Sequence, residues 1–179
     1  MGHQAFWKKT DTDAAGEQTR GDTWEQENSL RDNKMEVSIL AIPENEQLAR
    51  MLVTAFVMPL NPTIEELSDI KTAVSEAVTN AIIHGYPKEL FFGEEKYVHL
   101  TCKNEKHILH VKIQDEGVGI EDVKKAMEPM YTTKPELERS GMGFAFMEAF
   151  MDEVHVKSKL QKGVTVTMKK TIGKEVCHE

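Results

Sequence analysis

The sequence has few cysteines, no long apolar run and no excess of basic residues. Its two cysteines, Cys102 and Cys177, have no metal-like spacing, and a reduced, cytoplasmic chain is the simplest expectation. No apolar run approaches the roughly 20 residues that cross a bilayer, and no signal-peptide core follows the start. With 22 basic against 30 acidic residues, a net charge of −8 argues against a nucleic-acid-binding platform.

Length and composition predict one folded domain with a polar leader. The 179 residues, 40% hydrophobic and 29% charged, suffice for one well-buried core but not for two domains of ordinary size. Residues 1–34 have almost no aliphatic side chains, so we expect them to be disordered, with a docking motif around Trp7 as the alternative. Both tryptophans, Trp7 and Trp24, lie there. We expect the domain to span 35–172, followed by a tail over 173–179.

Hydrophobic periodicity predicts a mixture of strands and helices. A capping box, Thr63-x-x-Glu66, opens the longest predicted helix. The predicted elements are, in order, a strand near 35–41, helices over 44–57 and 63–85, strands over 97–103 and 108–115, a short helix over 123–127, a helix that begins at Gly143, and strands over 153–160 and 164–171.

The helix predicted over 44–57 has an apolar and a charged face. Its larger apolar residues are expected to face inward, namely Leu48, Met51, Leu52, Ala55 and Phe56. Glu46 and Arg50 are four residues apart and are expected to form an outward ion pair. Exposed pairs of this kind usually contribute well under about 1 kcal/mol.

The second half of the longest helix carries a polar stripe beside its apolar face. Glu76 and Asn80 are four residues apart, so a carboxylate and a carboxamide point the same way from one rigid support. Such a pair suits a hard cation and a proton, because an amide oxygen can ligate Mg²⁺ and a carboxylate can deprotonate a hydroxyl. A merely solvated helix face is the alternative. His84 follows one turn later, and Gly85 is expected to form a left-handed cap.

Two glycine-containing segments follow. Asp115 ends a predicted strand, and its carboxylate could accept a hydrogen bond from an exocyclic amine. Gly117 and Gly119 then let the backbone come close to a planar ligand. A strand followed by an ordinary glycine turn is the alternative. Further along, Gly141-Met142-Gly143 opens a helix whose exposed N–H groups would suit an anion, with Arg139 adding a cation. An ordinary helix start is the alternative there.

The order of these fragments resembles the ATP-binding domain family shared by gyrase, heat-shock chaperones, sensor histidine kinases and mismatch-repair proteins. The resemblance extends from Met35 to about Lys170. Within this family the chain is most similar to the bacterial anti-sigma factor serine kinases, in particular the group that acts in sporulation. Three segments carry this similarity: Ser75-Glu76-Ala77-Val78-Thr79-Asn80-Ala81-Ile82-Ile83-His84-Gly85-Tyr86, Tyr131-Thr132-Thr133-Lys134-Pro135 and Glu138-Arg139-Ser140-Gly141-Met142-Gly143.

The resemblance implies an α+β fold, a two-layer α/β sandwich in which helices cover one face of a mixed, mostly antiparallel sheet. It also implies roles for individual residues. Glu76 would be the general base, Asn80 the Mg²⁺ ligand and Asp115 the acceptor for the adenine amino group. The remaining residues expected at the ATP or ADP site are Gly117, Gly119, Thr132, Thr133, Lys134, Arg139, Gly141, Met142, Gly143 and Thr165.

One position departs from the family pattern. A threonine usually follows the glycine of the last hairpin, whereas Val164 follows Gly163 here and the hydroxyl stands at Thr165. The family also uses the helix surface that corresponds to Glu46 and Arg50 to bind protein partners. The implied partners are a sporulation sigma factor, an anti-anti-sigma factor that is phosphorylated on serine, and a second copy of the chain, with an edge strand near 37–41 as the seam.

Three other functions remain open at this point. A histidine-kinase catalytic domain would share the ATP site, but residues 1–34 contain only His3 and no amphipathic helix that could offer a phosphorylatable histidine. A non-enzymatic module that binds nucleotide as a structural ligand is the second. An anti-sigma kinase of a stress response rather than of sporulation is the third.

Overall fold

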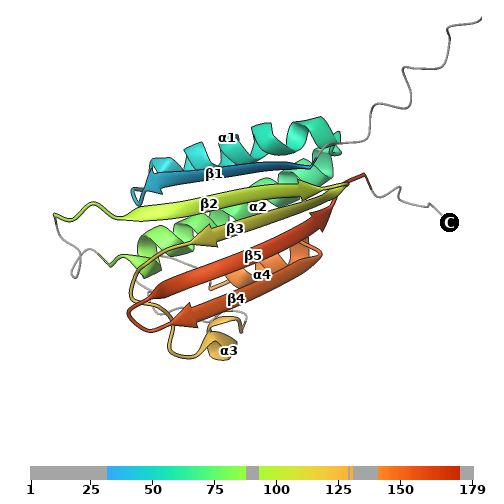
Figure 1. Ribbon diagram of the computed structural model, residues 1–179. Coiled ribbons are helices and arrows are strands. Elements are labelled where there is room, and N and C mark those ends of the chain that lie inside the picture. Colours follow the sequence, from blue (N-terminus) through green and yellow to red (C-terminus); the bar gives the residue numbers. More distant parts are fainter. Residues whose placement is uncertain (1–31, 88–92, 129, 131–140, 174–179) are drawn as a thin grey trace, which may run out of the picture.

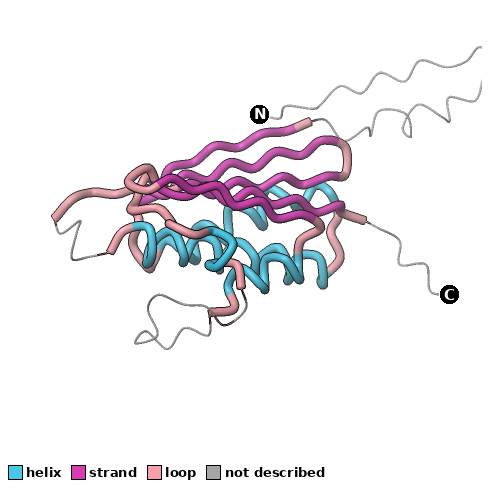
Figure 2. The backbone as a smooth tube through the Cα atoms, turned by 90° about the horizontal axis from the view of Figure 1, so that it is seen from below, coloured by secondary structure: helices cyan, strands magenta, loops and turns pink. Residues whose placement is uncertain are grey.

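The protein folds into an α+β sandwich of two layers, as expected. The computed structural model describes residues 32–87, 93–128, 130 and 141–173. A five-stranded sheet forms one layer and helices cover one of its faces (Figures 1 and 2). The strand order is β1-β2-β3-β5-β4, and each neighbouring pair is antiparallel. The resemblance implied a mixed, mostly antiparallel sheet, and these five strands are antiparallel throughout.

The predicted elements are present with small shifts at their ends. The element bounds are β1 Asn33–Leu40, α1 Asn45–Val57, the 3₁₀ turn η1 Met58–Leu60, α2 Ile64–Asn80, the π-helical turn η2 Ala81–Gly85, β2 Tyr97–Glu105, β3 Ile108–Gln114, α3 Val123–Ala126, α4 Gly143–Phe150, β4 Glu153–Lys159 and β5 Gly163–Thr171. β1 begins inside the segment assigned to the leader, because Asn33 and Lys34 pair with Asn104 and Lys103 of β2. Residues 1–31, with both tryptophans, and 174–179 lie outside the described residues.

The core lies between the sheet and the helices. The predicted apolar face of α2 and η2 is buried throughout, at Ile70, Ala73, Val74, Ala77, Val78 and Ala81. Alternate side chains of the central strands are buried too, such as Leu100 in β2 and Val111 in β3. Each fully buried large aliphatic side chain contributes about 1.5–3 kcal/mol. Burial also raises the pKa of Cys102 to about 12, so this thiol is unreactive at neutral pH.

Helix α1 buries a different face from the one predicted. Ala49, Val53 and Val57 are buried, whereas Met51 is 62% exposed and Leu48 42% exposed. Ala49, Val53 and Val57 face inward because α1 packs closely against α2 and β1, and Leu48 and Met51 lie away from that contact. Ala55 is also exposed, so the inward prediction was wrong for Leu48, Met51 and Ala55. Leu52 and Phe56 are half-buried and pack against the core, as predicted.

The ends of α2 differ in how they are built. At the start, the predicted capping box is present: Glu66 N–H donates to the Thr63 hydroxyl at 3.1 Å, and the Glu66 carboxylate accepts from Thr63 N–H at 2.8 Å. At the other end the helix widens into the π-helical turn η2. Gly85 belongs to that turn and has no positive φ, so the left-handed cap predicted there is absent. No helix in the described ranges is both long and apolar enough to cross a membrane.

Candidate functional site

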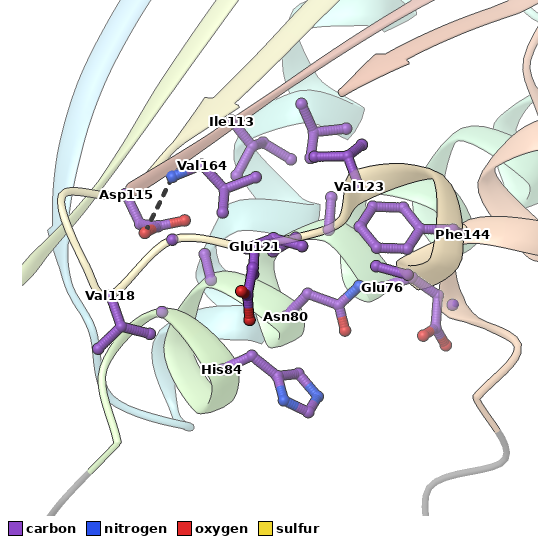
Figure 3. A pocket seen from close by; sticks show the side chains of 18 of the residues that line it. Glu76, Asn80, His84, Ile113, Asp115, Val118, Glu121, Val123, Phe144 and Val164 are labelled. Carbon is purple, nitrogen blue, oxygen red and sulfur yellow. Dashed lines mark hydrogen bonds between the residues drawn. The ribbon is translucent and has the colours of Figure 1, made fainter. Parts of the chain in front are cut away.

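A cavity of about 1020 Å³ lies on the helix-covered side of the sheet (Figure 3). One wall is the second half of α2 with η2, and another is formed by the ends of β3 and β5. The segment from Val118 to Ala126 and the N-terminus of α4 complete it. Several side chains labelled in Figure 3 lie around this space, with Asp115 and Val164 at one end and Glu76 and Phe144 at the other.

Asp115 lies at the first end, directly after β3. Its side chain is only 3% exposed. Its Oδ1 accepts hydrogen bonds from Gly117 N–H at 2.9 Å and from Val164 N–H at 3.3 Å. Among the described residues, Oδ2 accepts none, and it is therefore available to a ligand. Burial raises the pKa of Asp115, and these two N–H donors oppose that effect.

Glycines allow the backbone to close around Asp115. A Cβ atom at Gly85 would lie 2.8 Å from Asp115 Oδ1, and one at Gly117 would lie 1.9 Å from the Gly85 carbonyl oxygen. Gly163 has a φ of +85°, and a Cβ there would lie 2.0 Å from the Asp115 carbonyl oxygen. Gly85 is thus required by its contact with Asp115 and not by the helix end, a reason that local sequence could not reveal.

Glu76 and Asn80 lie at the other end, on the same face of α2 as predicted. Both line the cavity. They also approach the start of α4, because a Cβ atom at Gly143 would lie 3.0 Å from Glu76 Oε2 and 3.2 Å from Asn80 Nδ2. The positive end of the α4 helix dipole is therefore next to a carboxylate and an amide.

The other predicted site residues divide into three groups. Gly119, Gly141 and Met142 line the cavity together with Gly143, whereas Gly117 packs behind Asp115. Thr165 does not line it: β5 turns Val164 and Val166 toward the cavity, and strand alternation places Thr165 on the other face of the sheet. The placement of the hydroxyl at Thr165 in the site was therefore wrong. Four predicted residues lie outside the described residues, namely Thr132, Thr133, Lys134 and Arg139.

Several lining residues were not predicted. Ile113, Val164 and Val166 give the cavity an apolar wall at the Asp115 end, and their strand alternation was the available signal. Glu121 and Phe144 also line it, and no sequence pattern singled them out. His84 lines it as well, one turn after Asn80 on the same helix, so its spacing was a usable signal.

The arrangement suits a ligand with a planar donor at one end and an anion at the other. A buried carboxylate oxygen faces the apolar end, and a helix N-terminus with two oxygen-bearing side chains faces the other. In the described part of the chain, no three His, Cys, Asp or Glu side chains gather to hold a metal ion. The amide oxygen of Asn80 instead fits Mg²⁺ that is shared with a phosphate-bearing ligand, and the Glu76 carboxylate beside it fits a proton acceptor.

The chain is similar to proteins of known family over most of its length. Residues 39–170 match the family described as histidine kinase-like ATPase domain. The anti-sigma F factor of Geobacillus sp. (strain WCH70) is 52% identical over 142 residues, which cover 79% of this chain and 94% of that protein. The anti-sigma F factor of Clostridium perfringens is 54% identical over 142 residues, 79% of this chain and 99% of that protein.

Solved structures show the same fold at much lower identity. The crystal structure of the RsbU and RsbW domains of a Mycobacterium tuberculosis protein matches 78% of this chain and 32% of that one, with a TM-score of 0.56 and 16% identity. That similarity concerns the fold alone. The family follows from the sequence matches. The family match extends from the end of β1 to near the end of β5, and its range includes Glu76, Asn80, Asp115 and Gly143. The chain therefore belongs to the anti-sigma F factor family of histidine kinase-like ATPase domains.

Proposed function

We propose that the chain is an ATP-dependent anti-sigma factor and protein serine kinase. In this proposal it binds a sporulation sigma factor F and phosphorylates a serine of an anti-anti-sigma factor, which inactivates that protein. The observation that carries the proposal is the combination of two relatives named anti-sigma F factor, at 52% and 54% identity, with a cavity whose two ends suit a nucleotide.

In this proposal the base of the nucleotide lies at the Asp115 end of the cavity and its phosphates lie at the α4 end. Asp115 Oδ2 would accept a hydrogen bond from the adenine amino group, and the apolar wall of Ile113, Val164 and Val166 would contact the base. The phosphates would lie at the N-terminus of α4, where Gly143 lets them approach the backbone N–H groups. Without a threonine at 164, the wall offers no side-chain hydroxyl at that position.

Asn80 and Glu76 would serve the transfer itself. When bound, Mg²⁺ would be held by Asn80 Oδ1 and phosphate oxygens, and it would neutralise phosphate charge. The serine oxygen forms a bond to the γ-phosphorus, and the bond from that phosphorus to the oxygen bridging to the β-phosphate breaks, so that ADP leaves. Glu76 orients the hydroxyl and takes its proton.

Helix α1 supports a protein-binding surface. Arg50 Nε lies 2.9 Å from Glu46 Oε1. The Glu46 side chain is largely covered, with 20% of its surface accessible, so this ion pair is less exposed than an ordinary surface pair. The exposed Leu48 and Met51 lie on the same helix. We place the sigma factor on this surface, and a second copy of the chain against the edge strand β1.

The test is a pull-down of purified sporulation sigma factor F by this chain with and without Mg²⁺-ATP. We expect capture that depends on nucleotide and falls about tenfold in Arg50→Ala, because a truncated interface arginine commonly costs about 1.4 kcal/mol or more. Lys157→Ala, an exposed cation on β4 at the opposite edge of the sheet, is the matched control. If the parent chain captures no sigma factor either with or without Mg²⁺-ATP, the proposal is refuted.

The kinase part is tested separately with labelled ATP and the anti-anti-sigma factor. Labelled phosphate that survives acid and is lost in base identifies phosphoserine. Acid-labile phosphate would assign the chain to histidine-directed transfer instead. Nucleotide binding without any transfer would leave an anti-sigma factor that uses ATP only as a structural ligand.

A further inference from the structure

The Tyr86 side chain joins three parts of the chain at the Asp115 end of the cavity. It follows directly after the π-helical turn η2 and is only 7% exposed. Its hydroxyl donates to the Tyr97 carbonyl oxygen at 2.8 Å, at the start of β2. The same hydroxyl accepts a hydrogen bond from Glu116 N–H at 2.7 Å, in the segment that follows β3.

Neighbouring contacts hold the same segment to the end of α2. Val118 N–H donates to the Gly85 carbonyl oxygen at 3.0 Å, and Gly117 packs directly on that carbonyl. Gly85 in turn lies against the Asp115 carboxylate. The peptide before Glu116 is thus fixed through Tyr86, and the peptide between Gly117 and Val118 is fixed through Gly85.

These contacts bear on Asp115 because its carboxylate is oriented by the backbone that follows it. Oδ1 accepts from Gly117 N–H at 2.9 Å, and the orientation of that peptide depends on the Glu116 peptide before it. With Oδ1 held, Oδ2 keeps one direction toward the cavity. A hydrogen bond to a base depends on such alignment, since it weakens steeply when the donor–hydrogen–acceptor angle falls below about 120°.

We propose that Tyr86 is a positioning residue that sets the base selectivity of the site, by holding the Asp115–Gly117 backbone so that Asp115 Oδ2 points at the 6-amino group of a purine. The inference rests on the proposed nucleotide site. It requires the hydroxyl group and not only the buried ring, because the ring would pack equally well as phenylalanine. Burial raises the pKa of Tyr86, so the hydroxyl remains protonated and can donate to Tyr97 at neutral pH.

The test compares the affinities of two nucleotides, ATP and purine riboside triphosphate, which lacks only the 6-amino group. Because a hydrogen bond to a charged group is worth about 1.5–3 kcal/mol, the parent should prefer ATP by about tenfold or more. We expect Tyr86→Phe to lower this preference about fivefold. Tyr97→Phe is the matched control, since its hydroxyl contacts only the exposed Glu95 among the described residues, and its preference should equal that of the parent.

A double-mutant cycle separates positioning from general destabilisation. If Tyr86 acts through Asp115, Tyr86→Phe should have no further effect on the preference in an Asp115→Asn background. Equal preferences in Tyr86→Phe and the parent would overturn the inference and leave the proposed function intact. A parent that binds neither nucleotide would instead refute the proposed function.

Hydrogen exchange of the unmodified chain covers the case in which Tyr86→Phe does not fold. The Glu116 amide donates to the Tyr86 hydroxyl, so ATP should slow its exchange more than purine riboside triphosphate does. The Glu66 amide, which donates to the Thr63 hydroxyl at the start of α2 and does not line the cavity, is the internal reference. Equal slowing by the two nucleotides would contradict the role given to Tyr86.

Discussion

The two ends of the cavity are built in different ways. At the Asp115 end, backbone meets backbone: added Cβ atoms at Gly117 and Gly163 would lie 1.9 and 2.0 Å from carbonyl oxygens. At the Glu76 end, a Cβ at Gly143 would meet only the ends of side chains, at 3.0 Å or more. The first end is therefore set by the packing of the fold, and the second by side chains that can move.

Because of this difference, substitutions at the two ends should affect different properties, namely folding stability at the Asp115 end and the reaction rate at the Glu76 end. A backbone clash cannot be relieved by a rotamer change, so substitutions at the Asp115 end should act on folding as well as on binding. Side chains at the Glu76 end can be exchanged with little effect on folding, and their loss should appear in the reaction. Three predictions test this contrast.

The largest effect is expected at the Glu76 end. Glu76→Gln keeps the shape of the side chain but cannot accept the serine proton, so the rate of phosphate transfer should fall about 10²- to 10⁴-fold. The nucleotide affinity and the melting temperature should change little. Initial rates with labelled ATP, together with nucleotide titration, measure both. Glu65→Gln, on the exposed first turn of the same helix, is the control and should transfer phosphate like the parent.

The second prediction concerns the backbone contacts of Gly117. Gly117→Ala should lower the free energy of unfolding by about 3 kcal/mol or more, because the new Cβ collides with the Gly85 carbonyl. Gly143→Ala should change it by less than about 1 kcal/mol, because the Glu76 and Asn80 side chains can shift. Urea denaturation of both variants gives the comparison. Similar losses in the two variants would remove the distinction between the two ends.

The smallest effect is expected at Asp115, where a substitution should weaken ATP binding and also change how stability depends on pH. Asp115→Asn keeps an oxygen for Gly117 and Val164 but loses a carboxylate acceptor, so ATP affinity should fall about tenfold. Burial raises the Asp115 pKa on folding. The stability linked to its proton is therefore fully present below the unfolded pKa and is lost as pH rises through the folded pKa.

The Asp115→Asn variant has no carboxyl proton at this position. Its free energy of unfolding should therefore increase relative to that of the parent as pH rises through the folded pKa of Asp115 toward neutral. Urea titrations at a series of pH values measure this difference. A difference that stays constant with pH would show that Asp115 is not a buried, destabilised carboxylate.

Much of the fold and half of the site could be predicted from local patterns. The apolar arc of α2, the capping box at Thr63 and the common face of Glu76 and Asn80 follow from helical periodicity, which depends only on neighbours along the chain. Asp115 and Gly143 were found in the same way, as polar or glycine positions at element ends. The resemblance to a family then related these fragments to one another.

The wrong predictions share one cause, which is that they depended on a second element. Met51 is exposed because the face of α1 that packs on α2 and β1 is the one that carries Ala49 and Val53, and Met51 lies outside it. Gly85 has no positive φ, and the Asp115 carboxylate is what excludes a side chain there. Thr165 faces away because the register of β5 against β3 turns Val164 and Val166 to the cavity.

The sequence by itself determined the elements, the polar stripe of α2 and the glycines at the ends of β3 and α4, because these depend on backbone propensity and periodicity within one segment. Only the tertiary structure decided which face of α1 is buried, which atom of Asp115 is available, and that Tyr86 joins α2 to the segment after β3. Those features arise where residues far apart in the chain compete for the same space and the same hydrogen-bond partners, which no single segment encodes.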